Sequence, residues 1–385
     1  MKNMKQISKK VHSSMEDVYI HVDTTKSSFK KEKKKILNTP IKQIDIVKSK
    51  SLVDFVDSFK HMSIQARRIG ECASVYENML TDRRRPTIFL GIAGPLIAGG
   101  LRKVIRDMIE YGIVDVVVST GAILYQDLFQ TFGYKHYKGS PNADDAYLRK
   151  HLINRIYDTY VDDEKFVKLD TWVGRFAESL EARTYSSREF LYKLGKFIND
   201  PDSILGTAAR RGVPVFSPAL NDSSIGIGLT DYYHIMKKKK SDNKFLIDPI
   251  RDNYEITQIV VKSKATSAIY VAGGVPKNYI NDSVVMGYIF RKVTGGHIYA
   301  FQVTTDAPHW GGLSGSTLDE GKSWGKVNLK AHRAMAFVEP TVSLPLIVGY
   351  IIQKKVWKNR KRLLYSWKDD ILTGIKPGRK VNIIR

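Results

Sequence analysis

Residues 316–328, with the sequence STLDEGKSWGKVN, place two carboxylates, a tryptophan and a lysine within one short segment. The segment predicts the start of a helix, because Ser316 or Thr317 can cap it and Asp319 and Glu320 would lie in its first turn. Negative charge is favourable there, at the positive end of the helix dipole. The lysine at the far end of the segment needs a separate explanation.

Lys326, which follows Trp324 and Gly325, is a candidate nucleophile. A lysine forms an imine only as the uncharged amine, and an apolar neighbour such as Trp324 favours that form. Trp324 and Glu320 could also bind a cationic amine, by cation–π contact and charge pairing. These two residues share a helix face, so Lys326 reaches the same pocket only if the helix ends near Gly325. The alternative is that Lys326 merely caps the C-terminus of this helix.

A series of apolar segments predicts the scaffold that must position these residues. Six segments read as buried strands and alternate with helical patterns, which favours an α/β fold with a doubly wound, mainly parallel, Rossmann-like sheet. The strands are expected at 87–92, 114–120, 213–219, 267–274, 297–305 and at the start of 334–354, which continues as a helix.

Small or polar turns follow these strands, where ligands bind in such sheets. They lie at 91–94, 120–122, 217–222, 273–274 and 304–306, and together they suggest a nucleotide-sized site. The chain has neither a G-x-G-x-x-G fingerprint nor a G-x-x-x-x-G-K-[ST] loop. A dinucleotide would therefore bind without the usual motif.

Composition narrows the class of protein. The chain has 385 residues and is 43% hydrophobic, enough for a large core. We expect a basic N-terminal arm with helices over 1–80, forming a helical extension, and a catalytic domain over 81–385. The single cysteine, Cys72, and the lack of a signal-like or membrane-spanning segment favour a cytoplasmic protein. The nine histidines do not cluster, so no metal is expected.

The formal net charge of +23 suggests a surface that meets acidic partners. Much of the excess lies in three runs, at 29–35, 236–244 and 354–362. Such runs are most often solvated faces. Docking of an acidic partner is the next interpretation, and nucleic acid is not expected because no nucleic-acid-binding motif is present.

Several motifs resemble the deoxyhypusine synthase family. They are FSPAL-ND at 216–222, GGVPKN at 273–278 and DEGKSWGKV at 319–327, and they occur in the family's order between about 85 and 355. The resemblance implies an NAD-dependent, Rossmann-like enzyme that assembles as a homotetramer with sites at subunit interfaces. NAD oxidises spermidine, an aminobutyl group passes to an enzyme lysine as an imine, and a lysine of the translation factor 5A precursor receives it.

The resemblance also implies roles for individual residues. The imine-forming lysine matches Lys326. Positions implied to contact NAD are Gly94, Thr120, Gly121, Ala122, Gln126, Asp222, Gly273, Gly274, Thr305, Asp306 and Glu339. Positions implied to contact the substrate are Tyr125, Asn278, Trp310, Gly311, Gly312, Glu320 and Trp324.

The polyamine pocket departs from the family pattern. Asn278 stands where the family has a histidine base, Ile227 replaces an aspartate that grips the amine, and Trp310 stands where an acid is usual. His309 could replace the base, or could be structural. These changes fit the deoxyhypusine-synthase-like branch. They leave three functions open: transfer to a protein lysine, homospermidine-synthase-like transfer to a small amine such as putrescine, or a catalytically silent homologue.

Overall fold

The computed structural model describes residues 26–241, 245–312, 315–381 and 383. It divides into two compact units, residues 1–43 and 44–385. The described part of the first unit contains α2 (Ser27–Ile36), a lysine-rich helix without buried residues. Among the described residues, the second unit contains all the other elements, including α3 (Leu52–Phe59) and α4 (Ile64–Thr81), and α4 packs on the last two strands of the central sheet. The proposed boundary at residue 80 stays a prediction.

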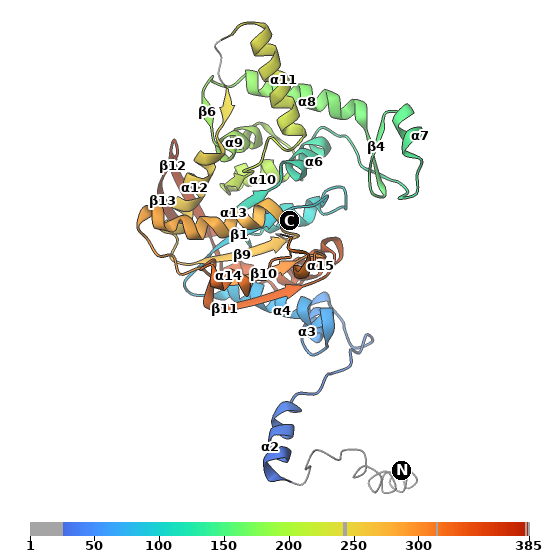
Figure 1. Ribbon diagram of the computed structural model, residues 1–385, viewed down its shortest axis with the longest axis vertical. Coiled ribbons are helices and arrows are strands. Elements are labelled where there is room, and N and C mark those ends of the chain that lie inside the picture. The colour runs from blue at the N-terminus through green and yellow to red at the C-terminus, as the bar shows by residue number, and fades with distance from the viewer. Residues whose placement is uncertain (1–25, 242–244, 313–314, 382, 384–385) are drawn as a thin grey trace. The chain divides into compact units, whose positions relative to one another are not determined.

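A six-stranded sheet forms the centre of the second unit (Figure 1). All neighbouring strands are parallel, and their order is β11-β10-β9-β1-β2-β7. Their bounds are β1 (Thr87–Ile92), β2 (Val116–Ser119), β7 (Val215–Phe216), β9 (Thr266–Val271), β10 (His297–Val303) and β11 (Val327–Ala336). The chain builds outward from β1 to β7 and then restarts at β9 on the other side of β1. The order therefore reverses between β1 and β9, the point where doubly wound sheets bind ligands.

Helices cover both faces of this sheet, as the expected doubly wound fold requires. Side chains alternate along β1, so Ile88, Leu90 and Ile92 join one apolar core and Phe89 joins the other. The first core also receives α4, α5 (Arg102–Glu110), α6 (Gly121–Thr131), α9 (Ser187–Phe197), α10 (Ile204–Arg211) and α15 (Pro340–Lys354). The second core receives α12 (Pro249–Lys262) and α13 (Gly274–Val285). The predicted α/β fold class is confirmed.

Smaller elements surround the sheet. They include a three-stranded sheet in the order β3 (Tyr137–Lys138), β5 (Thr159–Asp162) and β4 (Ile153–Ile156). Two further sheets have two strands each: β6 (Thr184–Tyr185) with β8 (Leu246–Ile247), and β12 (Lys361–Lys368) with β13 (Ile371–Lys380). The remaining helices are α7 (Asp145–Lys150), α8 (Asp163–Glu178), α11 (Ser224–Lys238) and α14 (Glu320–Ser323), with short 3₁₀ turns at Met286–Phe290, Pro308–Trp310 and Val356–Asn359. Within the described residues, we find no helix with the length and apolarity needed to span a bilayer.

Two local predictions needed adjustment. The last strand begins at Val327, not near 334, so Lys326 lies directly before an edge strand. The helix expected at 316–328 is a single turn, α14. It ends before Gly325, whose φ of +69° is in the left-handed region that glycine adopts without strain. The helix thus ends near Gly325, as Lys326 requires in order to reach the pocket.

Candidate functional site

The residues expected to bind NAD gather at one edge of the sheet. With the exception of Gln126, each of them follows the carboxyl end of a central strand, and all six strands contribute. Gly94 follows β1; Thr120, Gly121 and Ala122 follow β2; Asp222 follows β7; Gly273 and Gly274 follow β9; Thr305 and Asp306 follow β10; Glu339 follows β11. Because the strands are parallel, these turns lie at the same edge.

Two glycines flank the point where the strand order reverses. Gly94 has φ +88° and Gly274 has φ +58°, and a Cβ added at either position would meet no atom within 4 Å. Both turns thus leave open space beside the backbone. Gly274 also begins α13, where free backbone N–H groups favour an anion. These features fit the pyrophosphate of a dinucleotide.

A cavity of about 620 Å³ extends from this edge. Its walls include residues 98–100 after β1, the turn 156–159, and Glu339 and Thr341 at the start of α15. The Glu339 carboxylate accepts a hydrogen bond from the Thr341 backbone N–H at 2.8 Å and caps α15. Glu339 therefore presents a fixed carboxylate beside a space large enough for part of a nucleotide.

Gln126 and Gly121 shape the same edge from α6. Gln126 is buried, and its side-chain oxygen accepts from the Ala98 backbone N–H at 3.1 Å, so it holds the turn that follows β1. A Cβ at Gly121 would lie 2.3 Å from Ser223 Oγ, so only glycine allows this close approach of α6 to the loop before α11.

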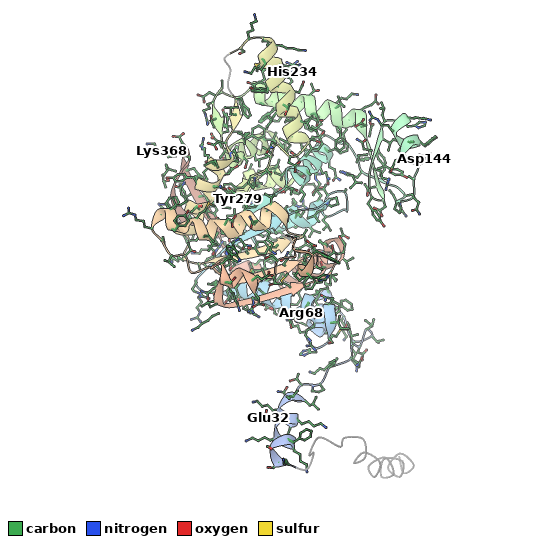
Figure 2. The ribbon with its side chains drawn as sticks, viewed as in Figure 1. Glu32, Arg68, Asp144, His234, Tyr279 and Lys368 are labelled. Atoms are coloured by element: carbon green, nitrogen blue, oxygen red, sulfur yellow. The ribbon has the colours of Figure 1, made fainter. Side chains whose placement is uncertain are left out.

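Lys326 lies in a second cavity, of about 300 Å³, on the α13 side of the sheet. Its Nζ is 3.0 Å from Asp282 Oδ1 and 5.4 Å from the centroid of the Trp324 ring. The cavity is lined by Lys277, Asn278, Asn281, Ser316, Thr317, Leu318, Gly321, Trp324, Lys326 and Val327. Figure 2 labels Tyr279 on α13, and this neighbour of Asn278 packs into the core while Asn278 lines the cavity.

Local hydrogen bonds fix the turn that carries Lys326. Thr317 and Glu320 form a reciprocal cap: the Glu320 N–H donates to Thr317 Oγ1 at 3.1 Å, and the Thr317 N–H donates to Glu320 Oε2 at 2.5 Å. The Lys326 N–H donates to the Gly321 carbonyl at 2.9 Å, and the Lys326 carbonyl accepts from the His297 N–H at 3.0 Å. The nucleophile candidate is thus held between α14 and the amino end of β10.

The backbone and side-chain donors of Thr317 lower the pKa of the Glu320 carboxyl, which the positive charge of Lys277 lowers further. Glu320 therefore stays ionised near the cavity, although it does not line it.

Asp282 is a site residue that the sequence analysis missed. Its second carboxylate oxygen accepts a hydrogen bond from Asn278 Nδ2 at 3.0 Å, while the first faces Lys326. Asn278 and Asp282 are four residues apart on α13, so an i,i+4 pairing on a helix could have pointed to Asp282. Asn278 therefore orients the carboxylate that contacts the lysine.

Lys277 is a second residue that was missed. It is 3% exposed, yet its amine reaches the same cavity as Lys326. Burial lowers the pKa of Lys277 to about 8, against the opposing effect of Glu320 and Asp306. The GGVPKN motif contains this lysine, but nothing in the local sequence showed that it was buried.

Other expected substrate contacts lie elsewhere. Tyr125 is buried and donates its hydroxyl to the Phe166 carbonyl at 2.9 Å. Trp310 is 76% exposed and does not line the Lys326 cavity, and Gly311 follows it in a left-handed turn. Gly312 approaches Asp306, since an added Cβ would lie 2.8 Å from Asp306 Oδ2. The single chain thus brings together Asn278, Trp324 and Lys326, with Glu320 next to them.

Comparisons with known proteins show which family the chain resembles. The family model for deoxyhypusine synthase matches residues 54–351. "Probable deoxyhypusine synthase 2" of Methanosarcina mazei is 41% identical over 334 residues, covering 86% of this chain and 94% of the relative. A "Deoxyhypusine synthase-like protein" of Elusimicrobium minutum is 40% identical over 344 residues, covering 87% and 90%.

The fold has a counterpart among solved structures. A crystal structure described as "a putative deoxyhypusine synthase from Entamoeba histolytica" aligns with a TM-score of 0.55 and 20% identity, over 80% of this chain and 96% of that one. At this identity the likeness supports the fold.

Proposed function

Because this chain belongs to the deoxyhypusine synthase family, we propose that it transfers the aminobutyl group of spermidine, through an imine on Lys326, to an amine acceptor. The observation that carries the proposal is Lys326 itself, which lies in a small cavity between an aromatic ring and a carboxylate. A cationic polyamine suits such walls. A catalytically silent homologue would have no need for this arrangement.

We assign the open edge around Gly94 and Gly274 to NAD, with Glu339 at its far end. When bound, NAD would supply an acceptor for a hydride from the spermidine carbon next to nitrogen and, in its reduced form, would return that hydride after transfer, so that the acceptor carries a saturated aminobutyl group. The protein's own part follows: the Lys326 amine attacks that carbon, a new C–N bond forms, and the bond to the departing diamine breaks.

A change at Gly274 tests the cofactor site. In the Gly274→Ala variant, the new methyl group enters the open space or the backbone leaves its left-handed conformation. Either effect is on the scale of about 1–2 kcal/mol, so NAD should bind roughly tenfold more weakly by calorimetry. Gly212→Ala is the matched control, with φ +67°, equal open space and a position before β7, at the opposite edge. Equal NAD affinities in the two variants would remove Gly274 from the cofactor site.

We propose a lysine of the translation factor 5A precursor as the first acceptor, because a curated relative with 41% identity is named "Probable deoxyhypusine synthase 2". Asp282 favours a second candidate, a small diamine such as putrescine. Asp282 contacts Lys326, which lines the cavity of about 300 Å³, and Glu320 lies next to residues that line it, so two carboxylates are available for the two amines of a diamine. Incubation with labelled spermidine and NAD, with the precursor, with putrescine, or with neither, shows which molecule gains the label.

An Asp282→Asn variant separates the two halves of the reaction. Once Lys326 becomes an imine, the Asp282 carboxylate is free to accept a hydrogen bond from the incoming acceptor amine. Loss of this charge-assisted contact, worth about 1.5–3 kcal/mol, should slow transfer by roughly tenfold to a hundredfold. The borohydride-trapped adduct should still form, which provides the internal control. Unchanged transfer would exclude Asp282 from acceptor binding.

We propose that the working protein is a cytoplasmic homotetramer whose sites lie between subunits. Asp282, which contacts Lys326, lies eight residues after Gly274, roughly 12 Å along α13. In a shared site, the strand-end turns around Gly94 and Gly274 of one subunit would meet the Lys326 cavity of another. Light scattering that finds a monomer at working concentration would contradict this assembly.

A further inference from the structure

Lys277 is a buried amine that the proposed reaction has not used. It lies one helical turn after Gly274 on α13, and it lines the same cavity as Lys326. Its Nζ donates to Gln302 Oε1 at 2.8 Å and to the Ser316 carbonyl oxygen. The Gln302 side chain in turn donates to the Ala272 carbonyl at 2.7 Å. Lys277 is thus held in one place by α13, β10 and the loop before α14.

The number of hydrogen-bond acceptors around Lys277 suits an uncharged amine. An ammonium group has three hydrogens to donate, whereas the neutral amine has two hydrogens and one lone pair. Within the described part of the chain, Nζ has two acceptors, Gln302 and Ser316. Both hydrogens of the neutral amine are then satisfied, and the lone pair is left to take a proton from the cavity.

Burial and the nearby charges together bring the pKa of Lys277 closer to neutral pH than that of an ordinary lysine. Burial lowers its pKa to about 8, and the positive charge of Lys326 acts in the same direction. Glu320, next to α14, and Asp306, after β10, act to raise it. The Tyr270 ring of β9 lies 6.0 Å from Nζ and carries no charge at neutral pH. A base works best when its pKa lies close to the operating pH.

We propose that Lys277 is the proton acceptor that serves Lys326. This inference rests on the proposed imine chemistry. The neutral Lys277 amine takes a proton from the Lys326 ammonium across the cavity that both side chains line, leaving Lys326 able to attack. As the C–N bond to the departing diamine breaks, the Lys277 ammonium returns the proton to that amine. Lys277 therefore ends this exchange of amines in its starting, uncharged form.

The first test observes Lys277 directly, without substrate. In wild-type protein labelled with ¹³C at lysine Cε, one resonance should titrate near pH 8, and Lys277→Met should remove it. If every lysine resonance titrates above about pH 10, the inference is wrong.

The second test uses the pH dependence of adduct formation. In the wild type, the rate of borohydride-trapped adduct formation should rise with pH and level off above about pH 8, because the base must be uncharged. Lys277→Met should lower the rate by roughly 10²-fold and abolish this rise. Gln302→Met is the control, since it breaks the same hydrogen-bond chain but keeps the amine, and it should retain the rise with pH.

The outcomes separate this inference from the proposed function. A wild type that forms no adduct would refute the function. A wild type that forms adduct, with a Lys277→Met variant of unchanged pH dependence, would refute the role of Lys277 alone. Equal losses and identical pH profiles in the Lys277 and Gln302 variants would assign Lys277 a purely structural role.

Discussion

Replacement of Lys326 by arginine should eliminate the covalent adduct. The guanidinium group stays protonated and cannot attack carbon, while its positive charge can still pair with Asp282. Removal of a covalent nucleophile typically costs 10⁴-fold or more, so we expect adduct formation to fall by roughly that factor. The measurement is borohydride trapping in the presence of spermidine and NAD, followed by peptide mapping.

A neighbouring lysine provides the control for this experiment. Lys322 belongs to the same short turn, but its Nζ pairs with Asp319 at 3.3 Å and it does not line the Lys326 cavity. Lys322→Arg should therefore give a normal yield of adduct. Peptide mapping must also distinguish Lys326 from Lys277, since both amines line the cavity. An adduct on Lys277 in the wild type would assign the nucleophile to α13 instead.

The parallel sheet could be predicted because its signals are local. A buried parallel strand is a short apolar run that ends in small residues, as in TIFLGI at 87–92, and such a run needs no knowledge of its neighbours. The turns at the strand ends could be predicted for the same reason, because their small residues are visible in the local sequence. The starting point of β11 was missed because its first half, with exposed Leu329 and Lys330, lies at the sheet edge and carries no continuous apolar run.

The surroundings of Lys326 could be predicted only in part. Trp324 and Glu320 are close to it in the chain, and the glycine that ends α14 was visible in the sequence. Asp282 and Lys277 lie more than forty residues earlier and reach the cavity through the packing of α13 on the sheet. No local pattern specifies which face of α13 meets the turn at 316–326. This information lies in the tertiary fold.

The second residue whose replacement should have a large effect is Asp115, whose charge should stabilise the folded protein. It is 3% exposed and precedes β2, at the edge of the sheet opposite the strand-end turns. Its carboxylate accepts two hydrogen bonds from Arg85 at 2.7 Å, another from the buried Arg360 and one from the Ile88 N–H at 2.9 Å. It thereby joins the starts of β1 and β2 to the segment before β12.

Burial acts to raise the pKa of Asp115, but the charges of Arg360 and Arg85 and their hydrogen bonds outweigh it and lower the pKa. The group therefore contributes stability at neutral pH. This contribution is lost only as the pH falls through the lowered folded-state value, below the ordinary range of an aspartate.

The Asp115→Asn variant should consequently be destabilised by about 3–5 kcal/mol, because it leaves the Arg360 guanidinium buried without its anion. Denaturant unfolding monitored by circular dichroism measures the change. Asp45→Asn is the control, because its partner Lys48 is 85% exposed, and its unfolding midpoint should not move. NAD affinity of the folded Asp115→Asn protein should equal that of the wild type. Asp115 lies at the amino ends of the strands, whereas the turns proposed to bind NAD follow their carboxyl ends. An unchanged unfolding midpoint would mean that the buried arginine finds another partner, and a weaker NAD affinity in the folded variant would mean that the two edges are coupled.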